Sequence, residues 1–218
     1  MSEHDFRIPS VDGFLGTLAS DDPTPGGGSS AAVAGAMGAA LVEMLARLTT
    51  GREKYADHDK LMEAIADQAA QERSTLLDLA ASDAEAYDGV SAAYRLPKES
   101  DEEKAKRHEA IQAAMKGACE TPLSIMQHSL EVLALAKNAV LYGNTNAASD
   151  GAAGAELARA AMKIASYNVK INLGSIQDAE YAKEAITRMD EMTHMGTSAS
   201  TAVENHVTNL WESKAPNA

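Results

Sequence analysis

The chain has 218 residues, of which 45% are hydrophobic and only 4% aromatic. A chain of this length can bury one substantial core, and the excess of Ala and Met over aromatic residues favours closely packed helices over a β-sandwich. The 32 acidic and 19 basic residues give a net charge of −13, which argues against nucleic acid or an anionic membrane as partner because both attract basic surfaces. We expect a single domain over residues 1–218, with its core at about residues 10–202.

The N-terminus has neither a basic leader nor an apolar signal segment, and the longest apolar run, residues 31–42, is about half the length that spans a bilayer. We therefore expect a cytoplasmic protein without a membrane partner. Cys119 is the only cysteine, and the six His residues show no metal-site spacing. The sequence predicts no internal disulfide and no metal site.

Helical periodicity and capping residues predict about seven helices in an all-α, up-and-down bundle, since no segment alternates like a strand. Ser10 caps a first short helix, Ser100 and Glu103 form a capping box, and Thr121-Pro122 places a cap and a first-turn proline at the start of another helix. We expect helices at about residues 10–19, 26–50, 58–94, from 100, 121–143, 150–172 and 175–211.

Small residues recur at intervals of four in the second predicted helix, at Ala31, Gly35 and Ala39 and again at Ala34 and Gly38. Such faces allow another helix backbone to approach closely, so we expect this helix to be central. Together with polar groups on the sixth predicted helix, these faces offer more packing surface than one bundle needs. They therefore predict a homodimer.

Asp83 lies in the middle of an apolar stripe on the wheel of the third predicted helix, whereas its acidic neighbours point away. The stripe comprises Leu76, Leu79, Tyr87, Val90 and Tyr94. A carboxyl group that is removed from water has a raised pKa and can exchange protons near neutral pH. A structural acid that caps a helix or pairs with a buried Arg fits the same pattern, and the wheel leaves both interpretations open.

Two amides, Asn168 and Asn172, lie on the apolar face of the sixth predicted helix. A buried Asn needs partners for up to four hydrogen bonds, which a heteroaromatic ligand could supply. Hydrogen bonding between helices at a subunit interface is the alternative.

Three glycines, Gly26 to Gly28, precede the second predicted helix. They are not followed by Gly-Lys-Ser/Thr, as the glycines of a P-loop would be, so we do not expect a nucleotide-binding site there. We expect Ser29 and Ser30 to cap that helix.

Four basic residues follow the ends of the second and third predicted helices, namely Arg52, Lys54, Arg95 and Lys98. In a protein of net charge −13, an anionic ligand needs a local basic patch of this kind. Lys54, with help from Arg52, is our candidate for holding an anionic tail. Charged helix ends are also commonly solvated without further function.

Six segments, taken together and in order, resemble the formiminotetrahydrofolate cyclodeaminase and methenyltetrahydrofolate cyclohydrolase family over nearly the whole chain. They are Pro-Thr-Pro-Gly-Gly-Gly-Ser (23–29), Gly-Arg-Glu-Lys-Tyr (51–55), Ser-Asp-Ala-Glu-Ala-Tyr (82–87), Arg-Leu-Pro-Lys (95–98), Gly-Asn with Ser-Asp (143–144 and 149–150), and Asn-Val-Lys-Ile-Asn (168–172).

The resemblance implies an all-helical homodimer that binds folate in a cleft near the glycine-rich loop and the Asn-rich helix. It implies that Asp83 is the catalytic proton donor and acceptor. Apart from the tetrahydrofolate substrate, no cofactor is expected. The motifs imply substrate-binding roles for Gly26, Gly27, Gly28, Ser29, Arg52, Lys54, Tyr55, Asn144, Asp150, Asn168 and Asn172.

Two activities occur in this family. One adds water to the methenyl bridge of 5,10-methenyltetrahydrofolate and gives 10-formyltetrahydrofolate, and the other closes a formimino group onto N10 with loss of ammonia. The mammalian cyclodeaminase is fused behind a formiminotransferase domain, for which this chain has no room, so we expect a cyclohydrolase. A cyclodeaminase is the alternative, and a non-catalytic folate-binding helical dimer is the alternative of another class.

Overall fold

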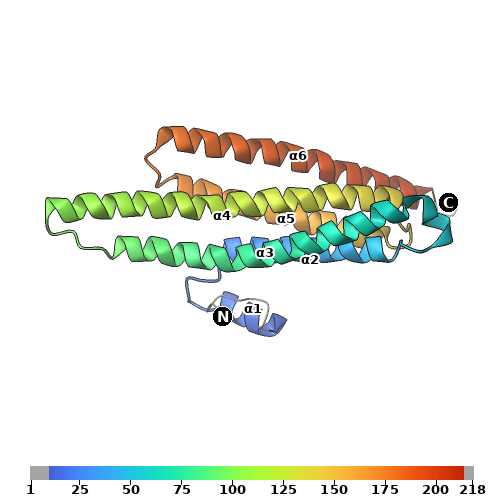
Figure 1. Ribbon diagram of the computed structural model, residues 1–218, viewed down its shortest axis with the longest axis horizontal. Helices are drawn as coiled ribbons and strands as arrows, with labels where there is room; N and C mark the ends of the chain where they lie inside the picture. The colour runs from blue at the N-terminus through green and yellow to red at the C-terminus, as the bar shows by residue number, and fades with distance from the viewer. Residues whose placement is uncertain (1–9, 214–218) are drawn as a thin grey trace.

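The computed structural model describes residues 10–213, and over these residues the chain is helical without strands. The all-α prediction is therefore confirmed. Figure 1 shows the long helices running up and down beside one another, with α6 along the outside. The elements are α1 (Val11–Leu18), α2 (Gly27–Arg47), the 3₁₀ helix η1 (Glu53–His58), α3 (Asp59–Tyr94), α4 (Asp101–Tyr142), α5 (Ala148–Leu173) and α6 (Ala179–Glu212).

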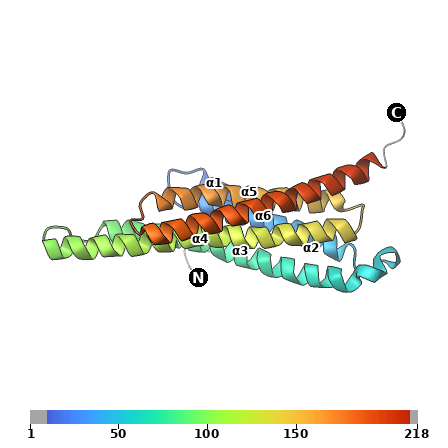
Figure 2. The ribbon, with the colours of Figure 1, turned by 90° about the horizontal axis from the view of Figure 1, so that it is seen from above.

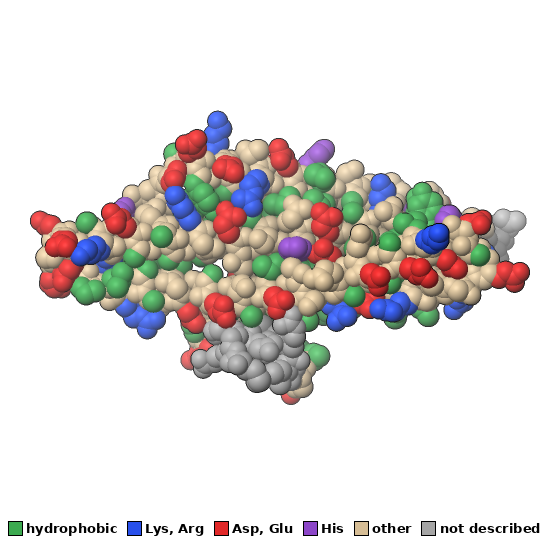
Figure 3. Space-filling view, viewed as in Figure 1, with side chains coloured by type: hydrophobic (Ala, Val, Ile, Leu, Met, Phe, Trp, Pro, Cys, Tyr) green, Lys and Arg blue, Asp and Glu red, His purple; other side chains and the backbone are tan. Residues whose placement is uncertain are grey.

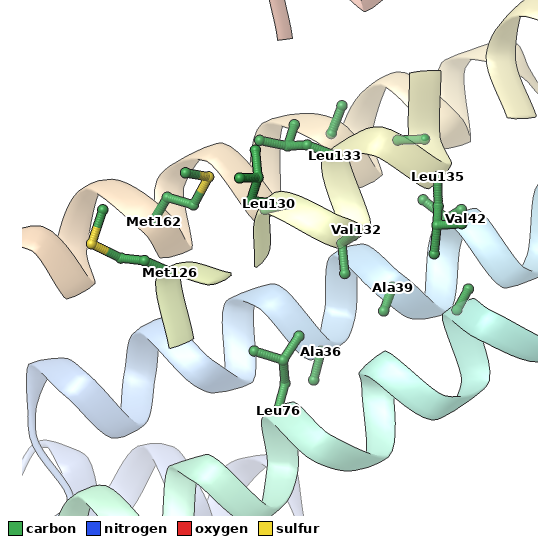
Figure 4. Packing of buried hydrophobic residues seen from close by; sticks show 14 of the residues in the cluster. Ala36, Ala39, Val42, Leu76, Met126, Leu130, Val132, Leu133, Leu135 and Met162 are labelled. Carbon is green, nitrogen blue, oxygen red and sulfur yellow. The ribbon is translucent and has the colours of Figure 1, made fainter. Parts of the chain in front are cut away.

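α2 is the central helix, as its small residues predicted, and it packs on α3, α4 and α5. Figure 4 shows Ala36 and Ala39 of α2 between Leu76 of α3 and Val132 of α4. By length and composition alone, α2 could cross a membrane (mean hydropathy 1.5), but 56% of this stretch is buried inside the protein. Its apolar character is thus accounted for by its place in the core.

Within residues 10–213 there are six α-helices rather than seven, because α4 continues through Thr121-Pro122. Proline has no N–H and therefore leaves the carbonyl of the residue four positions earlier without its helical partner. That carbonyl belongs to Ala118, and Asn172 Nδ2 of α5 donates a hydrogen bond to it at 2.7 Å. The sequence prediction of a break was wrong because a neighbouring helix supplies the missing donor.

The hairpin of α3 and α4 extends beyond the start of α2, and Figures 1 and 2 show this overhang at the end where the two helices join. A small separate cluster of Ala93, Ile111 and Met115 holds it together. Tyr87 and Tyr94, which the wheel placed in the buried stripe, are 47% and 49% exposed. They lie on the overhang, where α2 does not cover α3.

We predict that Asn172→Leu lowers the free energy of unfolding by about 1–3 kcal/mol, the cost of a buried carbonyl without a partner. Urea denaturation followed by circular dichroism measures it. In a Pro122→Ala background, residue 122 regains an N–H for the Ala118 carbonyl, so the same substitution should cost less than half as much. Equal costs in both backgrounds would mean that Asn172 stabilises the bundle in another way.

Candidate active site

Asp83 lies where the first turn of α2 meets the C-terminal third of α3. The fully buried Ser29 Oγ lies 3.1 Å from Asp83 Oδ2 and 2.9 Å from the backbone oxygen of Ala80. A Cβ atom on Gly28 would lie 2.6 Å from Asp83 Oδ2 and closer still to Oδ1. Glycine at position 28 is therefore what allows the carboxyl group to rest against the α2 backbone.

The start of α2 has no side-chain cap, and Gly26 is its N-cap residue. The prediction that Ser29 and Ser30 cap this helix was wrong. Ser29 faces Asp83 and Ala80, and the Ser30 hydroxyl donates to the Gly26 carbonyl at 2.8 Å. The positive end of the α2 dipole consequently faces the Asp83 carboxyl group.

Burial raises the pKa of Asp83 above its ordinary value, and hydrogen bonds from the Ser29 hydroxyl and backbone N–H partly oppose this. The neighbouring acids Asp78, Glu85 and Asp88 are exposed, as the wheel predicted. The buried stripe of α3 passes on one side of Asp83, which places this carboxyl group at the edge of the core. An acid in this position can meet both a ligand and water.

The partner of Asp83 distinguishes it from two other partly buried acids. Glu43 is ion-paired with Arg73 at 3.1 Å, and Glu72 contacts His128 at 2.7 Å. The pKa of Asp83, in contrast, is shifted by burial and by hydrogen bonds from the neutral Ser29, and no charged side chain within residues 10–213 contributes. This arrangement does not support the alternative of a structural ion pair with a buried Arg.

Asn168 of α5 flanks the first turn of α2. Its Nδ2 atom lies 3.7 Å from the position that a Cβ atom on Gly27 would occupy. The structure thus brings together the glycine-rich segment 26–29, Asp83 and Asn168. Asn172 lies one turn further along α5, where one of its donors is used by Ala118. Figure 3 shows an opening between α3 and α4 just beyond the start of α2. This opening is the candidate entrance to the site.

The remaining predicted binding residues lie at the opposite end of the bundle. α2 has 21 residues, and a helix of that length separates its two ends by about 30 Å. Within one chain, these residues therefore do not join Asp83. They are Arg52, Lys54, Tyr55, Asn144 and Asp150.

Two of these distant residues hold the connection between α4 and α5. The Tyr55 hydroxyl accepts the Thr145 backbone N–H at 3.1 Å, and Asn144 Nδ2 donates to the Leu48 carbonyl at 3.2 Å. Their contacts are those of a structural cluster. Arg52 and Lys54 beside it are exposed.

Two grooves flank α6, one against α4 with a volume of about 540 Å³ and one against α5 with about 510 Å³. Neither is lined by Asp83 or the glycine-rich segment, so the candidate site lies apart from both grooves. Among residues 10–213, no three His, Cys, Asp or Glu side chains gather where they could hold a metal ion.

We predict that Asp83→Asn raises the midpoint of thermal unfolding at pH 7. The pKa of Asp83 is higher in the folded than in the unfolded chain, so its ionisation costs folding free energy above the folded-state pKa. As the pH falls through that pKa towards the unfolded value of about 3.9, the wild-type carboxyl group becomes neutral and the advantage of Asn disappears. Calorimetry at pH 7 and near pH 4 tests this, with the exposed Glu85→Gln as control. A lower midpoint at pH 7 would contradict it.

Residues 10–191 match the family model described as formiminotransferase-cyclodeaminase. The chain is 40% identical over 181 residues to a methenyltetrahydrofolate cyclohydrolase from Methylorubrum extorquens, covering 83% of this chain and 87% of that protein. It is 30% identical to the formimidoyltransferase-cyclodeaminase of Gallus gallus over 84% of this chain, but spans only 35% of the chicken protein.

A solved structure has the same fold. The crystal structure of formiminotetrahydrofolate cyclodeaminase from Thermotoga maritima matches with a TM-score of 0.85 at 30% identity, covering 93% of this chain and 98% of that one. Sequence motifs, family model and fold therefore agree, and the chain belongs to the formiminotransferase-cyclodeaminase family.

Proposed function

We propose that this chain is a methenyltetrahydrofolate cyclohydrolase, which hydrolyses 5,10-methenyltetrahydrofolate to 10-formyltetrahydrofolate. The observation that carries the proposal is the partly buried carboxyl group of Asp83, held by a neutral hydroxyl at the start of α2. Its raised pKa suits a group that must both accept and return a proton. The 40% identity to a cyclohydrolase over 87% of that protein supports this reaction.

In the proposed reaction, the ionised Asp83 stabilises the cationic methenyl bridge and accepts a proton from a water molecule as its oxygen bonds to the bridge carbon. The resulting tetrahedral carbon carries a hydroxyl group between N5 and N10. The bond from carbon to N5 then breaks, Asp83 returns its proton to N5, and the hydroxyl group loses its proton to solvent as the formyl carbonyl forms. Water is the only co-reactant.

The cyclodeaminase reaction is the second candidate, because the matching Thermotoga maritima structure carries that name and is covered over 98% of its length. A chain without a formiminotransferase region can therefore be named for either activity, and our expectation from domain architecture does not separate them. Both reactions pass through a tetrahedral carbon between N5 and N10, where one carboxyl group can serve each. A non-catalytic folate-binding dimer would not need a carboxyl group whose partner, among the described residues, is a neutral hydroxyl rather than a charged group.

We predict that Asp83→Asn lowers kcat for methenyltetrahydrofolate hydrolysis by about 100-fold or more, the usual effect of losing a general acid or base. Loss of the near-ultraviolet absorbance of the substrate measures turnover, and a parallel assay with formiminotetrahydrofolate follows ammonia. Glu85→Gln should keep wild-type rates. Near-normal turnover by a folded Asp83→Asn protein would exclude the catalytic role, and faster ammonia release than hydrolysis by the wild type would favour the cyclodeaminase.

We further propose a homodimer, although not through the faces that the sequence suggested. Gly38 and Gly154 are used within the chain, because a Cβ on either would meet the backbone oxygen of the other within 2.9 Å. Instead, one side of α2 and its C-cap residue Leu48 expose large apolar side chains: Met37 is 55% exposed, Met44 38% and Leu48 40%. Exposed apolar patches of this kind mark interaction surfaces.

Helix α1 also exposes apolar side chains. Figure 1 shows it set apart from the bundle, and none of its residues is buried. Its apolar residues Val11 and Leu15 are 77% and 53% exposed. A second copy of the chain would cover both helices, and a two-fold axis across the middle of α2 would pair the start of each α2 with the end of its partner.

This antiparallel pairing would bring Arg52 and Lys54 of the partner subunit towards Asp83, where they could hold the anionic glutamate tail of folate. We predict that Asp83→Asn and the double variant Arg52→Ala/Lys54→Ala, each poorly active alone at low substrate concentration, regain activity when co-refolded. With random association, about one quarter of wild-type activity returns, because half of the dimers are hybrids with one complete site.

Co-refolding Asp83→Asn with Lys98→Ala is the control for the effect of the procedure on activity, and sedimentation reports the oligomeric state. No recovery in a dimeric mixture of the first pair would mean that each site uses residues of one chain. A fully active monomer would remove the dimer proposal altogether.

A further inference from the structure

The hydroxyl group of Ser29 has two acceptors within reach but a single hydrogen. Its Oγ atom lies 2.9 Å from the Ala80 carbonyl and 3.1 Å from Asp83 Oδ2, and the residue is fully buried. It can donate to only one of them at a time. Which acceptor it serves therefore depends on whether Asp83 itself carries a proton.

Both protonation states of Asp83 can be satisfied without moving a heavy atom. When the carboxyl group is ionised, the Ser29 hydroxyl donates to it, and the Ala80 carbonyl keeps the N–H that it accepts within α3. When the carboxyl group is protonated, its O–H donates to Ser29 Oγ, and the Ser29 hydroxyl turns to the Ala80 carbonyl at 2.9 Å. Neither state leaves a buried polar group without a partner.

We infer that Ser29 is a positioning residue that holds Asp83 in one place while it alternates between proton acceptor and proton donor. The inference rests on the proposed function for its catalytic meaning, but its structural content concerns the titration of Asp83 alone. Gly28 complements it, because the missing Cβ leaves the carboxyl group in contact with the first turn of α2.

Among the described residues, the charged groups around Asp83 leave this role to Ser29. Arg107 of α4 contacts Tyr94 of α3, and further along the two helices His128 of α4 contacts Glu72 of α3. Gly117 is about midway between the two contact positions on α4, and Asp83 is midway between those on α3, so the two residues lie level with each other. The charged residues near Gly117 on α4 are engaged elsewhere, Lys116 with Asp178 at 2.7 Å and Glu120 with Arg188 at 3.1 Å. The first turn of α2 contains no acidic residue, and Lys163 and Lys170 of α5 are exposed.

The test is the titration of Asp83 in wild type, Ser29→Ala and Ser29→Thr, followed by infrared difference spectroscopy with Asp83→Asn identifying the carboxyl band. Ser29→Ala removes the donor to the ionised form, so the pKa of Asp83 should rise further, and Ser29→Thr should restore it. Ser30→Ala, on the same turn, is the matched control and should leave the titration unchanged.

In the activity assay, Ser29→Ala should move the acid limb of the pH dependence of kcat to higher pH. It should lower kcat at pH 7 by about tenfold, the effect of losing one hydrogen bond to a charged group, with KM unchanged. An unshifted Asp83 titration in folded Ser29→Ala overturns the inference, whatever the activity. If the wild type turns over neither substrate, the proposed function fails while the titration still decides the role of Ser29.

Discussion

Backbone contact between α2 and α5 at Gly38 and Gly154 sets the position of the central helix. A Cβ on Gly38 would lie 2.7 Å from the Gly154 oxygen, so any side chain there would push the two helices apart. Because α2 also packs on α3 and α4, such a displacement would change the contact between its first turn and Asp83. The geometry of the candidate site thus depends on two residues that lie well away from it.

The polar residues on the inward face of α5 divide into two roles. Asn172 provides the hydrogen bond that Pro122 removes from the Ala118 carbonyl, and so keeps α4 continuous beside the site. Asn168 flanks the glycine-rich start of α2 and remains our candidate for contact with folate. The same residue type, four positions apart on one helix, therefore serves packing in one case and a proposed ligand contact in the other.

The electrostatics of the site differ from those of the molecular surface. The chain carries a net charge of −13, which repels an anionic folate in general, and Asp83 adds a carboxyl group at the centre of the proposed site. A cationic methenyl bridge is attracted to that carboxyl group, whereas the glutamate tail requires basic residues elsewhere. The distance between Asp83 and the Arg52–Lys54 pair within one chain is the physical reason for proposing that two chains share each site.

The sequence by itself determined the features that depend on neighbouring residues. Helical periodicity predicted the all-α class, and the Ser100–Glu103 capping box forms as expected, with Glu103 N–H donating to Ser100 Oγ at 3.1 Å. The wheel selected Asp83 and excluded its acidic neighbours, because a carboxyl group in an apolar stripe is visible from spacing alone.

Only the tertiary structure decided the features that depend on residues far apart in the sequence. The continuity of α4 required a donor from α5, and the exposure of Tyr87 depended on where α2 begins. The second acceptor of Ser29 is the backbone carbonyl of Ala80, 51 positions away, for which the sequence carries no signal. Such contacts arise when helices pack, and local propensity therefore does not reveal them.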